Sequence, residues 1–474
     1  MKQPNIVFIL ADDQRFDTIS ALGNREIETP NMDRLVKTGT SFTHAHIMGS
    51  TSAAVCMPSR AMMLTGRTLF SIQGAGETIP ASHAALPEWF RNHGYITTHV
   101  GKWHQDREAY NRCFSSGAKI FGFNFERGWY EGCNGHWHLP VHNYDPTGTY
   151  DKNGGYFLSP IEPFDQPYET CKENGRHSSE AFSDSAIEFI RDFPKSEPGK
   201  KGKPFFMYLA YLAPHDPRQY PMRWREFYND KDILLPENFM IQHPFDNGEM
   251  LVRDELLAAH PRKREDIRRH IRDYYAIISH LDEQIGRVLD SLEQTGQADN
   301  TIIVFSGDNG LAVGQHGLMG KQNLYDHSVR VPLIMAGPGI ARNRKSDAFC
   351  YLLDVFPTLC ELTDIAVPDT VEGKSLLPII RQQSVAVRDI LYLAYKGIQR
   401  AVRQRDWKLI EYVVNGKQTT QLFNLKNDPH EISNIADKPE HRHILDLLRK
   451  ELLCWKTEMG DTREMSAHFW DQFR

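Results

Sequence analysis

Continuous apolar runs alternate with amphipathic segments over the first three quarters of the chain. The runs at 6–10, 205–212 and 301–305 predict strands buried on both faces of a sheet. Residues 178–193 and 267–292 repeat apolar positions at helical spacing, and the second segment predicts a long amphipathic helix. This alternation predicts an α/β fold with a large mixed, mostly parallel sheet flanked by helices.

Shorter elements extend the same pattern to about residue 365. Residues 30–36 and 85–92 predict helices, and residues 95–100 and 331–335 predict further strands. From residue 366 onward, short alternating strands precede a terminal helix over about 440–458. We therefore predict a catalytic α/β domain over residues 1–365 and a small subdomain over residues 366–474, built from an antiparallel sheet and one helix.

Residues 105–177 interrupt the apolar periodicity. Gly, Asn, Tyr, Trp and His dominate this segment, as at Trp129-Tyr130 and at His136 and His138. Long irregular segments in compact domains are usually functional or disordered, and the many aromatic residues disfavour disorder. The segment is either a wall for a polyhydroxylated ligand, with His136 and His138 as substrate contacts, or an insertion that packs on the domain for structural reasons.

Polar side chains follow four of the predicted strands. Ligands bind beyond the carboxyl ends of strands in open α/β sheets, so we expect these side chains to meet at one edge. Two adjacent carboxylates there are either ligands for a hard cation or solvated acids at the start of a loop. The side chains are Asp12, Asp13, Lys102, His104, His215, Asp308 and Asn309.

Charge and composition exclude several classes of protein. Of the 474 residues, 40% are hydrophobic and 24% charged, as in an ordinary soluble globular protein, and the net charge of -6 gives no reason to expect nucleic acid. The basic run at 261–269 is interleaved with acids and predicts a solvated helix face. No apolar run reaches the roughly 20 residues of a membrane span. No leader is visible, so a cytoplasmic location is expected, or a periplasmic one if a leader was removed.

A short stretch near the first predicted helices carries the most specific signal. Cys56 precedes Pro58, which suits the first turn of a helix, and the segment closes at Gly66. A side chain at position 56 then lies at a helix N-terminus, where an anion is favoured, and Arg60 follows one turn later. Taken alone, this cysteine is either a nucleophile backed by an anion pocket or a buried residue at an ordinary helix start.

The full run reads Cys56-Met57-Pro58-Ser59-Arg60, with Leu64-Thr65-Gly66-Arg67 after it. This run resembles the signature of the type I sulfatases of the alkaline-phosphatase superfamily. The resemblance implies an alkaline-phosphatase-like fold and a sulfatase activity. It also implies that a maturing enzyme oxidises Cys56 to Cα-formylglycine, whose hydrated aldehyde attacks the sulfate ester. The positions Asp12, Asp13, Asp308 and Asn309 match the family's metal ligands, with residue 56 as a further one. Their oxygen atoms favour Ca²⁺, or Mg²⁺, over zinc.

The resemblance also implies roles for the remaining polar residues. Arg60, Lys102 and Lys321 would meet the charge of the sulfate, and His215 would protonate the leaving alcohol. Asp308 is a candidate acceptor for the proton of the attacking hydroxyl. His104 would deprotonate the second hydroxyl of the hydrate and so release the sulfate. For His316, which lies between two glycines, a substrate contact and a structural role both stay open.

The predicted substrate is a sulfated carbohydrate, on the basis of the aromatic and His-rich segment. A phosphonate or phosphate ester hydrolase of the same superfamily is the alternative, and a small sulfate such as choline sulfate is a further one. A non-catalytic protein that binds sulfated glycans is the competitor from another class, and the intact set of chemical groups disfavours it.

Overall fold

The computed structural model describes the chain except for residues 1–2, 124–134, 151–154, 159–170, 173–175 and 474. In the described part, a mixed sheet of eight strands forms the centre of the molecule, in the order β15-β2-β14-β12-β1-β10-β5-β6. The strands are β1 (Asn5–Ala11), β2 (Gly39–Phe42), β5 (Ile96–Lys102), β6 (Ser116–Phe121), β10 (Phe205–Ala210), β12 (Thr301–Gly307), β14 (Leu333–Ala336) and β15 (Arg344–Ser346).

The middle of this sheet is parallel. Strand β1 pairs in parallel with β10 and β12, and β10 pairs in parallel with β5, which pairs in turn with β6. Strand β14 runs antiparallel to β12 and to β2. The predicted mixed, mostly parallel sheet is therefore confirmed.

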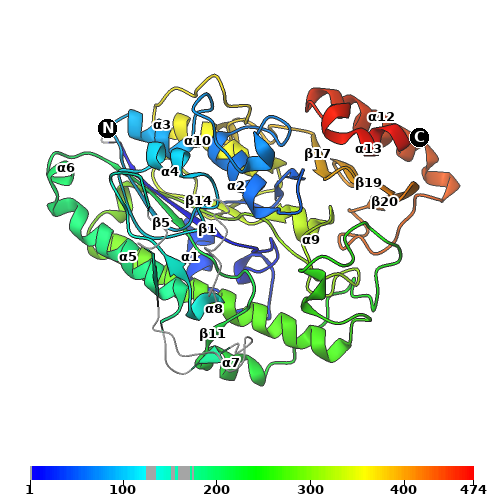
Figure 1. Cartoon of the computed structure of the whole chain (residues 1–474), viewed down its shortest axis with the longest axis horizontal. Helices are drawn as coiled ribbons and strands as arrows, with labels where there is room; N and C mark the ends of the chain where they lie inside the picture. Colours follow the sequence, from blue (N-terminus) through cyan, green and yellow to red (C-terminus); the bar gives the residue numbers. More distant parts are fainter. Residues whose placement is uncertain (1–2, 124–134, 151–154, 159–170, 173–175, 474) are drawn as a thin grey trace.

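Helices cover both faces of the sheet, so the central strands are buried on two sides, as their continuous apolar runs predict (Figure 1). Alternate residues of β1 point into two different cores, Ile6 and Phe8 on one side and Val7 and Ile9 on the other. One face carries α1 (Pro30–Thr38), α5 (Ser178–Asp192), α7 (Met222–Asn229) and α8 (Arg264–Gln294), and the other carries α2 (Cys56–Thr65), α3 (Leu86–Asn92), α4 (Arg107–Cys113) and α10 (Val355–Leu362).

The C-terminal region forms a second sheet, in the order β20-β19-β18-β17-β4. The strands β17 (Ile390–Tyr395), β18 (Gln399–Gln404), β19 (Trp407–Val414) and β20 (Lys417–Asn424) are antiparallel neighbours. Strand β4 (Gly49–Ser50) joins its edge in parallel, so a segment from early in the chain completes this sheet. Two helices follow, α12 (Arg442–Glu458) and α13 (Arg463–Gln472), where the sequence predicted one. The predicted boundary near residue 365 stays a prediction.

Short elements connect these layers. They are β3 (Ala45–His46), β7 (Pro140–Val141), β8 (Tyr156–Phe157), β9 (Cys171–Lys172), α6 (Glu197–Lys200), β11 (Tyr220–Pro221), α9 (Asp326–Val329), β13 (Arg330–Val331), β16 (Cys350–Tyr351) and α11 (Leu377–Ile380). In the described part of the chain, every helix is too short or too polar to cross a lipid bilayer.

The segment 105–177 is more regular than its composition suggested. Its first part forms α4 and β6, and β6 is an edge strand of the central sheet. Packing explains the difference, because the aromatic ring of Tyr110 on α4 is buried against His99 and Trp103 of the sheet face. The predicted aromatic pair Trp129-Tyr130 lies outside the described residues.

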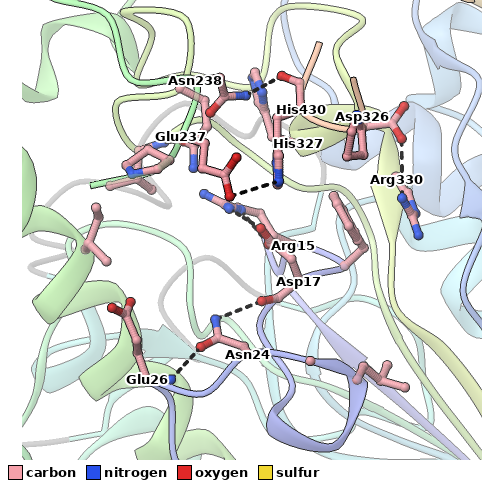
Figure 2. Close-up of a pocket in the computed structure, with 18 of the residues that line it drawn as sticks. Arg15, Asp17, Asn24, Glu26, Glu237, Asn238, Asp326, His327, Arg330 and His430 are labelled. Carbon is pink, nitrogen blue, oxygen red and sulfur yellow. Dashed lines mark hydrogen bonds and ion pairs between the residues drawn. The ribbon is translucent and has the colours of Figure 1, made fainter. Parts of the chain in front are cut away.

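A cavity of about 670 Å³ opens where the loops at 22–26, 234–238 and 429–431 approach the first half of α8 (Figure 2). Asp12, Asp13, Cys56 and His215, which belong to the candidate active site described next, do not line it.

Candidate active site

Four neighbouring parallel strands, β12, β1, β10 and β5, deliver most of the predicted residues to one edge of the sheet. Asp12 and Asp13 follow β1 directly, and Asp308 and Asn309 follow β12. His215 lies shortly after β10, and Lys102 is the last residue of β5. The convergence expected from the strand ends is therefore present in the structure.

Helix α2 brings Cys56 and Arg60 to the same place. Cys56 is its first residue, and the whole helix is buried. The Arg60 side chain donates from Nε to Asp308 Oδ2 (2.8 Å) and from Nη1 to the backbone oxygen of Lys102 (2.9 Å). Arg60 thereby ties the helix to the ends of β12 and β5, and its fixed charge lies inside the cluster.

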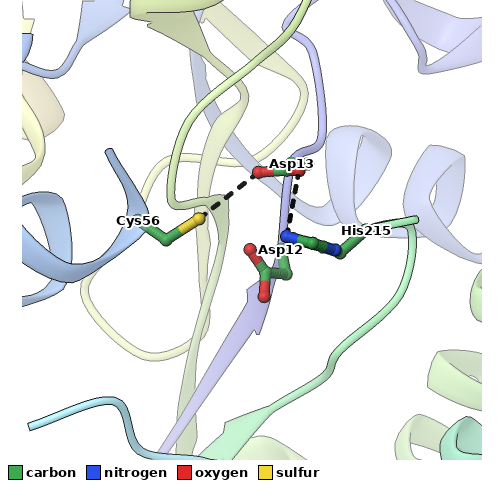
Figure 3. Close-up of side chains that lie close together, drawn as sticks. All are labelled: Asp12, Asp13, Cys56 and His215. Carbon is green, nitrogen blue, oxygen red and sulfur yellow. Dashed lines mark hydrogen bonds and ion pairs between the residues drawn. The ribbon is translucent and has the colours of Figure 1, made fainter. Parts of the chain in front are cut away.

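Asp13 lies at the centre of the cluster. Lys321 Nζ donates to both of its carboxylate oxygens, at 2.6 and 2.9 Å, and Asn309 Nδ2 donates to Oδ1 at 2.7 Å. The Cys56 sulfur lies 3.4 Å from the same Oδ1, and His215 Nε2 lies 3.7 Å from Oδ2 (Figure 3). The backbone of Asp13 has a φ of 67°, which turns its carboxylate back toward α2.

Asp12 is fully buried and pairs with the Lys102 ammonium, and Arg60 Nη2 lies 3.7 Å away. Burial alone would raise the pKa of Asp12, but Lys102, His215 and Arg60 hold it well below its usual range. For Asp308, burial and the neighbouring Asp12 raise the pKa to about 6, against the opposing effect of Arg60. The two carboxylates thus have different proton affinities.

The Cys56 thiol has an unfavourable environment for ionisation. Its sulfur lies 3.0 Å from Lys321 Nζ, but burial and the nearby Asp12 raise the pKa of the thiol well above its usual value. The nucleophilic form of cysteine is the thiolate, so unmodified Cys56 is a poor nucleophile at neutral pH.

The two predicted catalytic histidines are both partly exposed. His104 has a φ of 75°, and desolvation together with Lys102 keeps its pKa well below 6.5, so the ring is neutral. His215 lies beside Asp13, and its Nδ1 lies 2.7 Å from the backbone oxygen of Asp216.

The three predicted substrate contacts lie outside the cluster. His136 is fully buried, stacks on His177, and has its ring nitrogens 2.9 Å from Ser178 Oγ and 3.0 Å from the backbone oxygen of His215. His316 is buried against Tyr325 and contacts Asn238. His138 is also buried. These positions favour packing roles, because a hidden ring whose nitrogens contact protein atoms has little left to offer a substrate hydroxyl.

The oxygen atoms of the cluster fit a bound cation. Asp12 Oδ1 and Asn309 Oδ1 are buried and have no hydrogen-bond partner among the described residues. One ligand atom from each of Asp12, Asp13, Cys56 and His215 lies within 4.8 Å of the others. Buried oxygens without partners are costly unless a ligand satisfies them, and carboxylate and amide oxygens are preferred by hard divalent cations.

Two residues support the cluster through hydrogen bonds that the sequence did not predict. The Tyr274 hydroxyl donates to the backbone oxygen of Asp13 (2.6 Å) and accepts from the backbone nitrogen of Arg15 (3.0 Å). The Ser59 hydroxyl donates to the backbone oxygen of Asp308 (2.5 Å). The helical pattern predicts Tyr274 only as part of the apolar stripe of α8. Nothing in that pattern predicts that its hydroxyl forms hydrogen bonds in the site.

Comparison with known proteins agrees with this geometry. The sulfatase family profile matches residues 4–365, and the profile for the C-terminal part of N-sulphoglucosamine sulphohydrolase matches residues 314–458. An N-acetylglucosamine-6-O-sulfatase of Bacteroides thetaiotaomicron is 26% identical, over 98% of this chain and 88% of its own length. An arylsulfatase of Clostridium perfringens is 28% identical, over 95% of this chain and 94% of its own length.

Solved structures share the fold. One, in complex with its substrate D-glucosamine-2-N,6-O-disulfate, has a TM-score of 0.71 at 23% identity and covers 97% of this chain and 99% of its own. The phosphonate monoester hydrolase of Agrobacterium radiobacter also has a TM-score of 0.71, at 21% identity, with 96% of both chains covered. The family profile spans three quarters of the sequence, and the chain belongs to the type I sulfatases of the alkaline-phosphatase superfamily.

Proposed function

We propose that the chain removes sulfate from a sulfated carbohydrate, with residue 56 as the nucleophile after oxidation to Cα-formylglycine. The observation that carries this proposal is the buried cluster in which Cys56 meets carboxylates and the cations Arg60, Lys102 and Lys321. Sulfated sugars are favoured by the relatives, which include an N-acetylglucosamine-6-O-sulfatase and a protein solved with a sulfated glucosamine.

The environment of residue 56 supports a modified side chain. A thiol with a raised pKa, close to Asp12 and Asp13, has little nucleophilic character. The hydrate of an aldehyde supplies two hydroxyls, one to attack sulfur and one whose deprotonation expels the sulfate. A maturing enzyme that acts on Cys56 is therefore a required partner of the chain.

A divalent cation, Ca²⁺ or as the alternative Mg²⁺, would be held by Asp12, Asp13, Asp308, Asn309 and residue 56. The unpartnered Oδ1 atoms of Asp12 and Asn309 support this assignment. When bound, such a cation polarises sulfate oxygens and favours the ionised form of a neighbouring hydroxyl.

The remaining residues would bind the sulfate and move protons. Lys102, Lys321 and Arg60 present positive charge where the negative charge of the sulfate spreads during transfer. His215, beside Asp13, is placed to protonate the leaving alcohol. His104, kept neutral by desolvation, is able to accept the proton of the second hydroxyl.

Hydrolysis of phosphonate or phosphate esters is the second candidate function. It is favoured by the phosphonate monoester hydrolase among the structural neighbours, and by a 26% identical relative from Trinickia caryophylli described as a multifunctional alkaline phosphatase superfamily protein. Parallel rates on 4-nitrophenyl sulfate and 4-nitrophenyl phosphate separate the two functions. A phosphatase rate that exceeds the sulfatase rate would rule out the first proposal.

The nucleophile is tested with Cys56→Ala. We expect the variant to lose turnover entirely and still to bind a sulfated sugar, because Arg60, Lys102 and Lys321 remain. Intact-mass measurement of the wild-type protein, co-expressed with a sulfatase-maturing enzyme, should show the loss of mass that accompanies conversion of thiol to aldehyde. Wild-type turnover without that change, or turnover by Cys56→Ala, would refute the assignment.

A further inference from the structure

The two ring nitrogens of His215 face different groups. Nε2 points toward the cluster and lies 3.7 Å from Oδ2 of Asp13 (Figure 3). Nδ1 lies 2.7 Å from the backbone oxygen of Asp216 and 3.4 Å from its carboxylate oxygen Oδ1. A backbone oxygen can only accept, so Nδ1 carries a hydrogen and Nε2 is the nitrogen that can exchange a proton with a substrate. The direction of Nε2 therefore depends on the position of Asp216.

The Asp216 carboxylate is held by an arginine from another part of the chain. Arg253 donates from Nη1 to Oδ2 (2.7 Å) and from Nη2 to Oδ1 (2.9 Å), which makes the pair bidentate. Among the described residues, this carboxylate makes its hydrogen bonds and ion pairs with Arg253 and His215. Exposed ion pairs usually contribute little, but here the carboxylate is mostly buried and the guanidinium binds both of its oxygens. Arg253 thus restrains the residue that orients the ring.

Arg253 is itself held from its other side. It donates to Asp254 Oδ1 from Nε (3.0 Å) and from Nη2 (2.7 Å). The other oxygen of Asp254 accepts from Gln322 Nε2 at 2.7 Å. The next residue, Glu255, accepts from two backbone nitrogens of the loop at 319–322, both at 2.9 Å. This loop carries the lysine proposed to bind sulfate, and its contacts with Asp254 and Glu255 do not pass through Arg253.

We propose that Arg253 is a positioning residue, which directs Nε2 of His215 toward the leaving group by holding Asp216. The inference rests on the proposed function, because it assigns Arg253 a part in protonation of the leaving alcohol. Loss of Arg253 releases Asp216 and the ring, whereas the cations that would bind sulfate keep their own contacts. The effect should therefore fall on esters whose leaving group needs a proton, and should spare those whose leaving group does not.

The mature full chain is tested with phenyl sulfate and 4-nitrophenyl sulfate, with kcat/KM as the measure of sulfate transfer. Phenol has a pKa of about 10, as tyrosine has, so its departure needs a proton, whereas 4-nitrophenolate is a far better leaving group. Arg253→Met should lower kcat/KM on phenyl sulfate about tenfold and on 4-nitrophenyl sulfate about twofold or less. Arg253→Lys keeps a charge between the two carboxylates but loses the bidentate fork, so we expect a loss of about threefold on phenyl sulfate.

Arg269→Met is the matched control. The Arg269 side chain is 63% exposed, against 61% for Arg253, and it pairs with Asp266 of α8 at 3.1 Å. We expect this variant to hydrolyse both esters at the wild-type rate. The unfolding temperature of every variant is measured alongside, and if Arg253→Met does not fold, the ratio of the two rates in Arg253→Lys decides.

His215→Ala distinguishes failure of this inference from failure of the proposed function. We expect it to lower kcat/KM on phenyl sulfate about a hundredfold, and far less on 4-nitrophenyl sulfate. If it lowers both rates equally, the role of His215 in the proposed function is wrong, and the role of Arg253 is overturned with it. If His215→Ala is selective for phenyl sulfate but the Arg253 variants change both rates equally, or change neither, the role of His215 stands and that of Arg253 alone is overturned.

Discussion

The Asp13 carboxylate lies at the centre of the candidate site. The backbone of Asp13 has a conformation that few non-glycine residues adopt. Its φ of 67° lets one carboxylate contact Lys321, Asn309 and Cys56. Left-handed conformations cost free energy unless the surroundings hold them. The hydroxyl of Tyr274, 2.6 Å from the backbone oxygen of Asp13, is one such restraint.

Replacing Tyr274 by Phe should therefore loosen Asp13 without disturbing the core. The ring still packs in the stripe of α8, but the hydroxyl is lost, and with it the hydrogen bonds to the backbone oxygen of Asp13 and from the backbone nitrogen of Arg15. We expect kcat/KM to fall about three- to tenfold, which corresponds to about 0.5–1.5 kcal/mol for a lost hydrogen bond. We also expect half-maximal activity to require a higher concentration of Ca²⁺. Steady-state kinetics over a Ca²⁺ titration measures both effects.

The neighbouring Tyr275 supplies the matched control. Its hydroxyl accepts from Asn24 Nδ2 at 3.2 Å and does not contact Asp13. Tyr275→Phe should leave the concentration of the proposed cation at half-maximal activity unchanged. If the cation concentration at half-maximal activity rises equally in the two variants, Tyr274 acts through general packing and has no positioning role.

The sequence predicted the residues that carry the chemical groups of the site, but it did not predict the residues that hold those groups in place through hydrogen bonds. Asp12, Asp308 and Lys102 were located because polar residues directly follow buried strands. Tyr274 could not be found in this way, because it lies 261 positions from Asp13 and its aromatic ring fits an apolar stripe. Hydrogen bonds to backbone atoms of distant loops leave no pattern in a single sequence.

Helix α2 is the element whose position decides whether Cys56 and Arg60 reach the cluster. Gly76 packs directly on it, and a Cβ at that position would lie 2.8 Å from both Ala61 Cβ and Pro58 Cα. The contact involves backbone, so the helix itself would have to shift. Gly76 also has a φ of 91°, which disfavours any side chain.

Gly76→Ala should therefore reduce both stability and activity. We expect about 1–3 kcal/mol lower stability from strain and overpacking, and at least a tenfold loss of kcat, because small displacements of reacting groups are costly. Gly94→Ala is the control, because Gly94 has nearly the same φ of 92° and open space around its Cβ. Denaturant unfolding and kinetics on both variants separate the backbone effect from the shift of α2. Equal activities in the two variants would contradict the argument.

Helices and strands were predicted correctly where the apolar periodicity is strong. They were missed where the apolar pattern is weak. The strands β1, β10 and β12 and the long helix α8 appear where the sequence placed them. The sequence did not predict helices α7 and α13. Helix α7 has a single buried residue, Tyr228, so its apolar stripe is too weak to be read from sequence.

In the molecule as a whole, the C-terminal sheet contacts segments that carry residues of the catalytic cluster and contributes no residue to the cluster itself. Asp326, on α9 shortly after Lys321, pairs with Arg403 of β18 (2.6 Å) and Lys408 of β19 (2.9 Å), and all three are buried. Strand β4 pairs with β17 just before Cys56. None of the predicted catalytic residues comes from the C-terminal sheet, yet it supports the segments that carry two of them. Sequence could not show this, because the contacts join parts of the chain that are far apart.

Buried neutral histidines distributed through the molecule make its stability depend on pH. Burial lowers the pKa of His99 to about 3, of His136 to about 4 and of His316 to about 3. In the unfolded chain each has a pKa of about 6.5. Between these values the unfolded state binds protons that the folded state does not, so the free energy of unfolding falls as the pH drops below about 6.5. At pH 5 the loss is about 1.36 × 1.5, or about 2 kcal/mol, for each such residue.

Denaturant unfolding at pH 7.5, 6.5 and 5 measures this dependence, and His99→Phe identifies its source. The His99 ring packs among Trp103, Phe114 and Tyr208, so a phenyl ring fits the same aromatic environment. We expect the variant to lose about 2 kcal/mol less than the wild type between pH 7.5 and pH 5. Asp216, whose pKa is lowered by His215 and Arg253 against the effect of burial, affects stability only at lower pH. Asp308 and Asp282, whose pKa values are raised by burial to about 6 and about 7, partly offset the loss in this range, and they do so equally in the wild type and the variant. An identical loss in the wild type and the variant would therefore place the acid sensitivity elsewhere than in the buried histidines.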